Sequence, residues 1–133
     1  MMSAVMHQHP QFQNPQPWTM AMYRKRMVFM MIVSYADWFR RDDLAWVSEN
    51  WHIWEAFERE ALRIWKRGRT HYSARTIIEY LRHESEIREA PNAAGWKIND
   101  HYTPSLARLF TLMHPDKSGF FEKRSGQSAV RSI

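Results

Sequence analysis

Two short strings bracket the most informative helix of this chain: Tyr102-Thr103-Pro104-Ser105 at its start and His114-Pro115-Asp116-Lys117-Ser118-Gly119 at its end. At the start, Thr103 can cap the helix and Pro104 fits the first helical position, where a missing N–H has no intrahelical partner to lose. At the end, the Pro and Gly residues break the helix and turn the chain into Phe120-Phe121-Glu122-Lys123-Arg124. We expect this basic, aromatic segment to be a strand.

A second helix is predicted upstream, beginning at Ser73, whose hydroxyl can accept from the N–H groups of the first turn. Its buried stripe follows helical spacing at Ala74, Ile77, Ile78 and Leu81. It stops by Pro91, after which Trp96-Lys97-Ile98 alternates as a short strand would. Helix, turn, helix and basic strand is the order of a winged helix-turn-helix. The sequence therefore predicts a mainly α fold of the α+β class, a single winged helix-turn-helix-like domain.

The clearest helix in the sequence runs from Trp51 to Lys66, with Asn50 as its expected N-cap. Gly68 follows, where a left-handed closing conformation is expected. One face carries its apolar residues at a period of 3.6, namely Ile53, Trp54, Phe57, Ala61, Ile64 and Trp65. We expect an N-terminal helical extension of the domain to pack on this helix.

The remaining segments set the domain boundaries. Residues 1–19 are rich in Gln, Pro, His and Asn and predict a disordered arm. The apolar run Met27–Val33 is too short for a membrane helix and is interpreted as a buried strand or short helix of the core. The alternative is an exposed docking strip. The domain is expected over residues 20–124, and residues 125–133 look like a flexible tail.

Composition excludes some classes of protein without selecting one. The chain has 44% hydrophobic residues, enough for a core, and no cysteine, which excludes disulfides and thiol chemistry. Its net charge is +5, from 19 Lys and Arg against 14 Asp and Glu. A mildly basic chain is compatible with nucleic acid, but many solvated helix faces have the same balance. The absence of cysteine also fits a reducing cytoplasm.

Three strings form a recognisable constellation: residues 70–78 (THYSARTII), residues 96–104 (WKINDHYTP), and His114-Pro115 with Gly119-Phe120-Phe121-Glu122. Together they resemble a group of small bacteriophage and prophage proteins over about Trp38 to Arg124. Ala107-Arg108 supplies the Ala-Arg element of that pattern, and Asp100 replaces a more usual Asn. The resemblance implies phage or prophage origin, and with it a location in the cytoplasm of a host bacterial cell. It brings no established activity or catalytic residues.

No catalytic constellation is found in the sequence. The string His114-Pro115-Asp116-Lys117 matches the tetrapeptide of J-domain co-chaperones. Ser118-Gly119-Phe120-Phe121 is a poor start for the long helix that a J-domain requires after it, so a helix-stopping role is preferred. The seven histidines lack a metal-ligand spacing, and the helical glutamates sit at distances typical of surface ion pairs. We expect no enzymatic activity, no cofactor and no metal site.

The first function hypothesis is a phage or prophage accessory protein that binds duplex DNA. In a winged helix the second helix of the motif enters the major groove, and the wing and the preceding helix start reach phosphates. Arg108 is the residue able to make a bidentate guanine contact. The expected DNA-binding residues are Ser73, Arg75, Lys97, Tyr102, Thr103, Ser105, Arg108, Thr111, Lys123 and Arg124.

The second hypothesis is a protein–protein interaction module, for instance a phage inhibitor or adaptor that engages a host or defence protein. Its basis is an excess of tryptophan: the chain has seven, more than so small a core needs. Trp and Tyr are enriched at the energetic centres of interfaces. Homodimerisation is a simpler variant, and a membrane partner is not expected.

Overall fold

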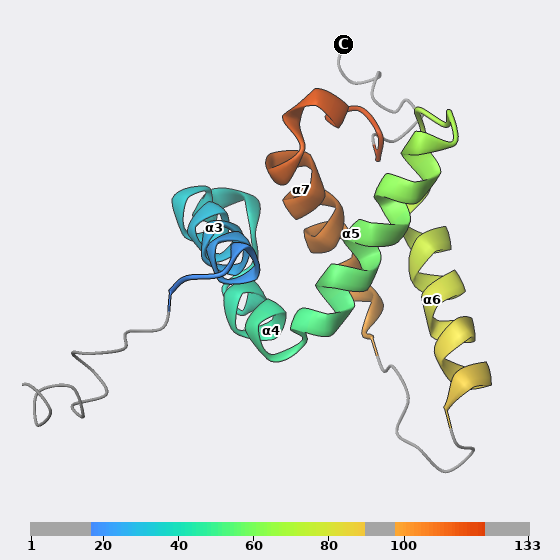
Figure 1. Ribbon diagram of the computed structural model, residues 1–133, viewed down its shortest axis with the longest axis horizontal. Helices are drawn as coiled ribbons and strands as arrows, with labels where there is room; N and C mark the ends of the chain where they lie inside the picture. Colours follow the sequence, from blue (N-terminus) through green and yellow to red (C-terminus); the bar gives the residue numbers. More distant parts are fainter. Residues whose placement is uncertain (1–16, 90–97, 122–133) are drawn as a thin grey trace, which may run out of the picture.

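The computed structural model describes residues 17–89 and 98–121 (Figure 1). Its α-helices are α3 (Met20–Ser34), α4 (Asp43–Glu49), α5 (Trp51–Lys66), α6 (Ala74–Arg88) and α7 (Thr103–Met113). Three short 3₁₀ turns accompany them: η1 (Ala36–Trp38) follows α3, η2 (Asp100–Tyr102) precedes α7, and η3 (Pro115–Lys117) follows α7. The prediction of a mainly helical protein with a helical N-terminal extension is confirmed.

Helix α7 occupies the centre of the arrangement because it packs against α3, α5 and α6 (Figure 1). Its buried residues Leu106, Leu109 and Phe110 form the middle of the core. Helix α3 adds Val28 and Ile32. The other two helices contribute Ile53, Trp54, Phe57, Ala61 and Ile64 from α5 and Ile77, Ile78 and Leu81 from α6. Each large side chain buried in this way stabilises the fold by about 1.5–3 kcal/mol.

The segment after α7 is not the predicted strand. Phe120 and Phe121 lie in a turn, and Phe120 is fully buried. Its ring contacts those of Phe110, Trp65 and Tyr72, with centroids 5.7 to 6.4 Å apart. The backbone N–H of Tyr72 also donates to the Phe120 carbonyl at 2.9 Å. The aromatic residues that suggested a strand therefore close the core.

The β part of the predicted fold class is not supported, since residues 17–89 and 98–121 contain no strand. The wing residues Glu122, Lys123 and Arg124, the strand residues Trp96 and Lys97 and the tail at 125–133 lie outside the described residues. The connection also differs from a helix-turn-helix: α6 ends at Arg88 and α7 begins at Thr103. A helix-turn-helix joins its helices by about three or four residues.

The predicted helix ends have mixed outcomes. Ser73 caps α6 as expected, with its hydroxyl accepting from the Thr76 N–H at 3.2 Å, and Gly68 has a φ of +102°. Thr103 does not cap α7; it is the first helical residue, and its buried Oγ1 has no partner among the described residues. Asn50 does not cap α5 through its side chain, which instead donates to the Trp46 carbonyl at 2.9 Å.

The apolar run Met27–Val33 is helical and belongs to α3. Val28 and Ile32 are buried, whereas Met27, Met30 and Val33 are exposed. Helix α3 packs chiefly on α7 and α4, so the expected packing on α5 is only a minor part of its contacts. The run is therefore a core element on one side and a free surface on the other. Within the described chain, no helix combines the length and the hydrophobicity that crossing a bilayer requires.

The predicted disordered arm, residues 1–19, includes two residues that are part of the fold. Thr19 is the N-cap of α3, and its hydroxyl accepts from the Met22 N–H at 3.1 Å. Trp18 also contacts the ring of Tyr23, with the two centroids 5.3 Å apart. Both residues therefore belong to the folded domain. Residues 1–16 lie outside the part of the chain that the structure describes.

Candidate functional site

The orientation of α3 is fixed by a buried carboxylate. Glu58 of α5 is only 4% exposed and forms an ion pair with Arg24 of α3. Nε2 of His114, just after α7, lies 2.7 Å from the same carboxylate oxygen. Burial by itself would raise the pKa of Glu58, but the hydrogen bonds from His114 and Arg24 outweigh burial and hold that pKa below its usual value. Because Arg24, Val28 and Ile32 recur every four residues, this ion pair turns their side of α3 inward.

Two neighbouring carboxylates, the buried Asp43 and the exposed Asp42, account for two of the predicted DNA-binding residues. Ser105 is 3% exposed and donates to Oδ2 of Asp43 at 2.6 Å. Tyr102 donates to Asp42 at 2.5 Å and stacks on Trp46 with ring centroids 4.3 Å apart. This hydrogen bond lowers the pKa of Asp42 and raises that of Tyr102. Ser105 is thus not on a contact surface, and Tyr102 is committed to holding α4 against the start of α7.

Four of the predicted DNA-binding residues do meet at one open groove between the start of α6 and the exposed side of α7. The groove holds about 1010 Å³. Ser73 and Arg75 line one wall, and Thr103 and Arg108 line the other. Arg75 is paired with Glu79 at 3.3 Å, and Ser73 is engaged as a helix cap. The structure therefore brings four of the ten predicted residues together, and two of their four polar groups already have internal partners.

Arg108 is the cation that this groove leaves unpaired. It is exposed and has no ion-pair partner within residues 17–89 and 98–121. His71 also lines the groove, and Asp100, which lies 3.5 Å from Arg82, adds a negative charge to it. Thr111 is half-buried and donates to the Ala107 carbonyl at 3.1 Å, so its hydroxyl is used within α7. The predicted residues Lys97, Lys123 and Arg124 lie outside the described residues.

The largest concentration of exposed apolar side chains lies elsewhere, between residues 18 and 44. Ten of the twelve exposed large apolar residues of the described chain fall in this segment: Trp18, Met20, Met22, Tyr23, Met27, Met30, Val33, Tyr35, Trp38 and Leu44. The other two, Tyr80 and Ile87, are on α6. Folded monomers rarely leave large contiguous apolar patches open, and such patches mark interaction sites.

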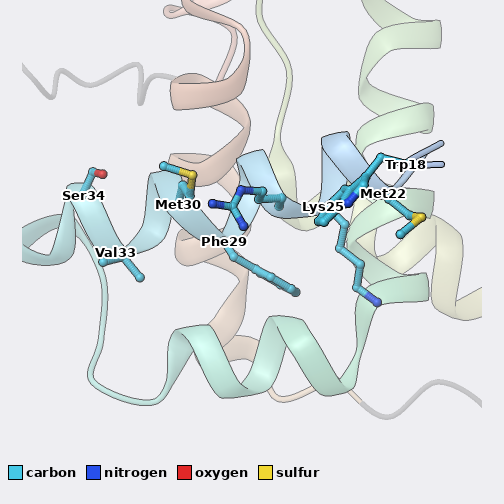
Figure 2. Close-up of a pocket in the computed structure, with 8 residues that line it drawn as sticks. Trp18, Met22, Lys25, Phe29, Met30, Val33 and Ser34 are labelled. Atoms are coloured by element: carbon cyan, nitrogen blue, oxygen red, sulfur yellow. The ribbon is translucent and has the colours of Figure 1, made fainter. Parts of the chain in front are cut away.

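Part of this surface is hollowed along α3. The hollow has a volume of about 560 Å³ and is lined by Trp18, Met22, Lys25, Arg26, Phe29, Met30, Val33 and Ser34. In Figure 2, Lys25, Phe29 and Val33 project from one side of α3 and Met30 and Ser34 from the other, so the hollow follows the helix. Trp18 is 47% exposed and Met30 is 52% exposed. The side of α3 opposite Val28 is therefore open, apolar and shaped to receive side chains.

Two cations lie beside the hollow without a carboxylate partner among the described residues. Nζ of Lys25 lies 5.3 Å from the ring centre of Trp51, and the guanidinium of Arg26 lies 6.0 Å from that of Trp18. Cation–π contacts orient the two charges but leave them un-neutralised. Arg24, the third cation of this run, is used internally by Glu58. The hollow is thus apolar along its length and positively charged at one part of its rim.

Sequence reasoning did not identify Met22, Lys25 and Arg26 as site residues, and it included Met30 only through the alternative that Met27–Val33 is an exposed docking strip. Apolar residues surround α3 on all sides, so no period distinguished the outer face from the inner one. In the described ranges, no cluster of His, Asp and Glu has the geometry of a metal site. Comparison with protein-family models, curated proteins and solved structures yields no match.

Proposed function

We propose that this protein is an interaction module that docks a partner protein on the outer face of α3. The observation that carries the proposal is the concentration of exposed apolar residues on α3, around a hollow of about 560 Å³. The opposite face of the same helix is held in the core by Val28, Ile32 and Arg24. A firmly anchored helix with an open apolar face is the geometry of helix-in-groove and helix-pair recognition. If the resemblance to phage proteins holds, the partner is a host or defence protein in the bacterial cytoplasm.

The aromatic and methionine content of the face supports the same function. Trp18 and Tyr23 supply rigid aromatic surface, which is enriched at interface hot spots. Met22, Met27 and Met30 supply flexible side chains that adapt to a partner. Neither group contributes to the core, since these five residues are all exposed.

Position-specific crosslinking in bacterial cells tests this proposal. A photo-crosslinking residue placed at position 22 or 30 should give one discrete protein adduct that survives nuclease treatment. The matched control is position 87, because Ile87 is also an exposed apolar helical residue but lies on α6. Adducts of equal yield at all three positions, or none at positions 22 and 30, would contradict docking on α3.

A second candidate function is binding of duplex DNA at the groove between α6 and α7. The observation favouring it is the convergence of Arg75, Arg108 and His71 there, close to the cations Lys66, Arg67 and Arg69 along the chain. Phosphates are the natural ligands of such a surface, and the binding would be strongly dependent on salt. Because α7 exposes only a narrow stripe, we propose contacts to the DNA backbone in preference to base reading in the major groove. This proposal keeps the DNA-binding part of the winged helix-turn-helix prediction and leaves out its wing, because the described residues contain no strand.

A further inference from the structure

We infer that the partner segment occupying the α3 hollow is an acidic amphipathic helix. This inference rests on the proposed docking function and specifies the chemistry of its occupant. It combines two properties of the hollow, an elongated apolar floor and two adjacent cations without carboxylate partners.

The dimensions of the hollow fit a short helix. Its lining residues on α3 run from Met22 to Ser34, and twelve steps of about 1.5 Å along a helix give roughly 18 Å. A partner helix of about three turns covers that length. Such a helix presents apolar side chains at spacings of three, four and seven, which match the positions of Met22, Phe29 and Val33 on α3, seven and four residues apart.

The charges of the hollow select an acidic partner. Lys25 and Arg26 are oriented by the rings of Trp51 and Trp18, so less side-chain freedom is lost when they meet a carboxylate. The residues 20–34 that form α3 contain no Asp or Glu. A partner helix with Glu or Asp flanking its apolar stripe would neutralise both cations, whereas a basic helix would be repelled.

The charges disfavour one other occupant, and the shape of the hollow disfavours another. A second copy of α3 would bring further cations and no carboxylate to the interface. A lipid surface could supply anionic headgroups, but it is flat and would leave the hollow unfilled. A protein helix satisfies the shape and the charge together.

The test uses the full chain and two fluorescent peptides of about eighteen residues, long enough to form helix. Both carry leucines at helical spacing; glutamates flank the leucines in one peptide and lysines in the other. At low ionic strength the acidic peptide should bind at least about tenfold more tightly, as two charge pairs would provide. The variant K25E/R26E should reverse this preference. The control K66E/R67E makes the same charge reversal at a second Lys-Arg dipeptide, at the end of α5, and should leave the preference for the acidic peptide unchanged. Thermal melts check that each variant is folded.

Each contrary result has a distinct meaning. Equal binding of both peptides would overturn the acidic preference and leave docking on α3 standing. Crosslinking at positions 22 and 30 without any peptide binding would overturn the helical occupant in the same way. If K66E/R67E alters the preference as much as K25E/R26E, the effect is non-specific electrostatics and the inference falls. If the protein binds phosphatidylserine vesicles through Lys25 and Arg26 and binds neither peptide, the occupant is a lipid surface. If it dimerises with increasing concentration and K25E/R26E does not, the occupant is a second copy of the chain.

Discussion

The two open surfaces of this protein differ in how far their charged groups are already used. In the groove between α6 and α7, Arg75 pairs with Glu79, Asp100 lies near Arg82 and Ser73 caps a helix. In the α3 hollow, Lys25 and Arg26 have aromatic neighbours but no carboxylate among the residues described. The comparison shows that converging polar residues do not by themselves make a site. The α3 hollow is the better candidate for a ligand, because it combines exposed apolar side chains with two cations that have no carboxylate partner among the residues described.

The buried and the exposed face of α3 differ in the same way within one helix. The largest difference in effect is expected when the same substitution is made on each face. Ile32→Asp places an unpaired charge in the core and should unfold the domain, with a loss of more than about 4 kcal/mol. Met30→Asp alters the outer face and should change the free energy of unfolding by less than about 0.5 kcal/mol. Phe29→Asp should fall between them, because Phe29 is half-buried beside Trp51. Urea unfolding measures all three, and equal losses for Ile32→Asp and Met30→Asp would refute the two-faced description.

The second largest effect is expected at the buried carboxylate that holds α3. Glu58→Gln leaves Arg24 without its ion pair and should destabilise the protein by about 2–3 kcal/mol at pH 7. Breaking a fully buried ion pair would cost more, but Arg24 is partly exposed. The folded-state pKa of Glu58 is lowered, so its contribution is present above the unfolded-state pKa of about 4.3 and is lost as pH falls through the lower folded value. The wild type should therefore lose stability in acid more steeply than Glu58→Gln. Parallel urea curves from pH 7 to pH 3 for the two proteins would contradict this role.

A smaller effect separates docking from folding. The double variant Met22→Glu/Met30→Glu should weaken binding of the acidic peptide at least about tenfold, since it places two anions in the apolar hollow. Its thermal melting should match the wild type, because both side chains are exposed. Ile87→Glu is the control and should bind normally. Fluorescence anisotropy gives the affinities, and undiminished binding by the double variant would exclude the hollow as the docking site.

The smallest effect is expected on DNA binding at the groove between α6 and α7. If the groove between α6 and α7 contacts DNA phosphates, Arg108→Ala should weaken binding of all duplex sequences alike and lower the salt slope by about one. Arg88→Ala, at the far end of α6, should leave both unchanged. Mobility shifts over a range of salt concentrations measure the slope. Absence of duplex binding at low salt would remove the second candidate function.

Features set by neighbouring residues were predictable from the sequence. The bounds of α5 follow from its apolar period, and the Ser73 cap follows from a hydroxyl at the start of a helix. Features set by distant residues were not. Ser105 is drawn inward by Asp43, and Tyr102 by Asp42, partners about sixty positions away. Phe120 was predicted to lie in a strand, but its side chain is buried in the core.

The candidate site was only half predictable for the same reason. Ser73, Arg75, Thr103 and Arg108, which were selected from the helix-turn-helix pattern, line one groove, and their role there stays a prediction. The outer face of α3 could not be told from the inner face in sequence, because its methionines look the same as the buried Val28 and Ile32. The positions of α7 and α4 and the Glu58 ion pair determine which side is covered.

The most direct test of docking on α3 is a methyl NMR titration of the full chain labelled with ¹³C at its methionine methyl groups. On addition of the acidic peptide, the account predicts that the signals of Met22 and Met30, which line the hollow, shift progressively. Met113, which packs against the core, should stay unchanged and provides the internal control. Peptide binding that leaves the Met22 and Met30 signals in place would contradict the assignment of this surface as the docking site.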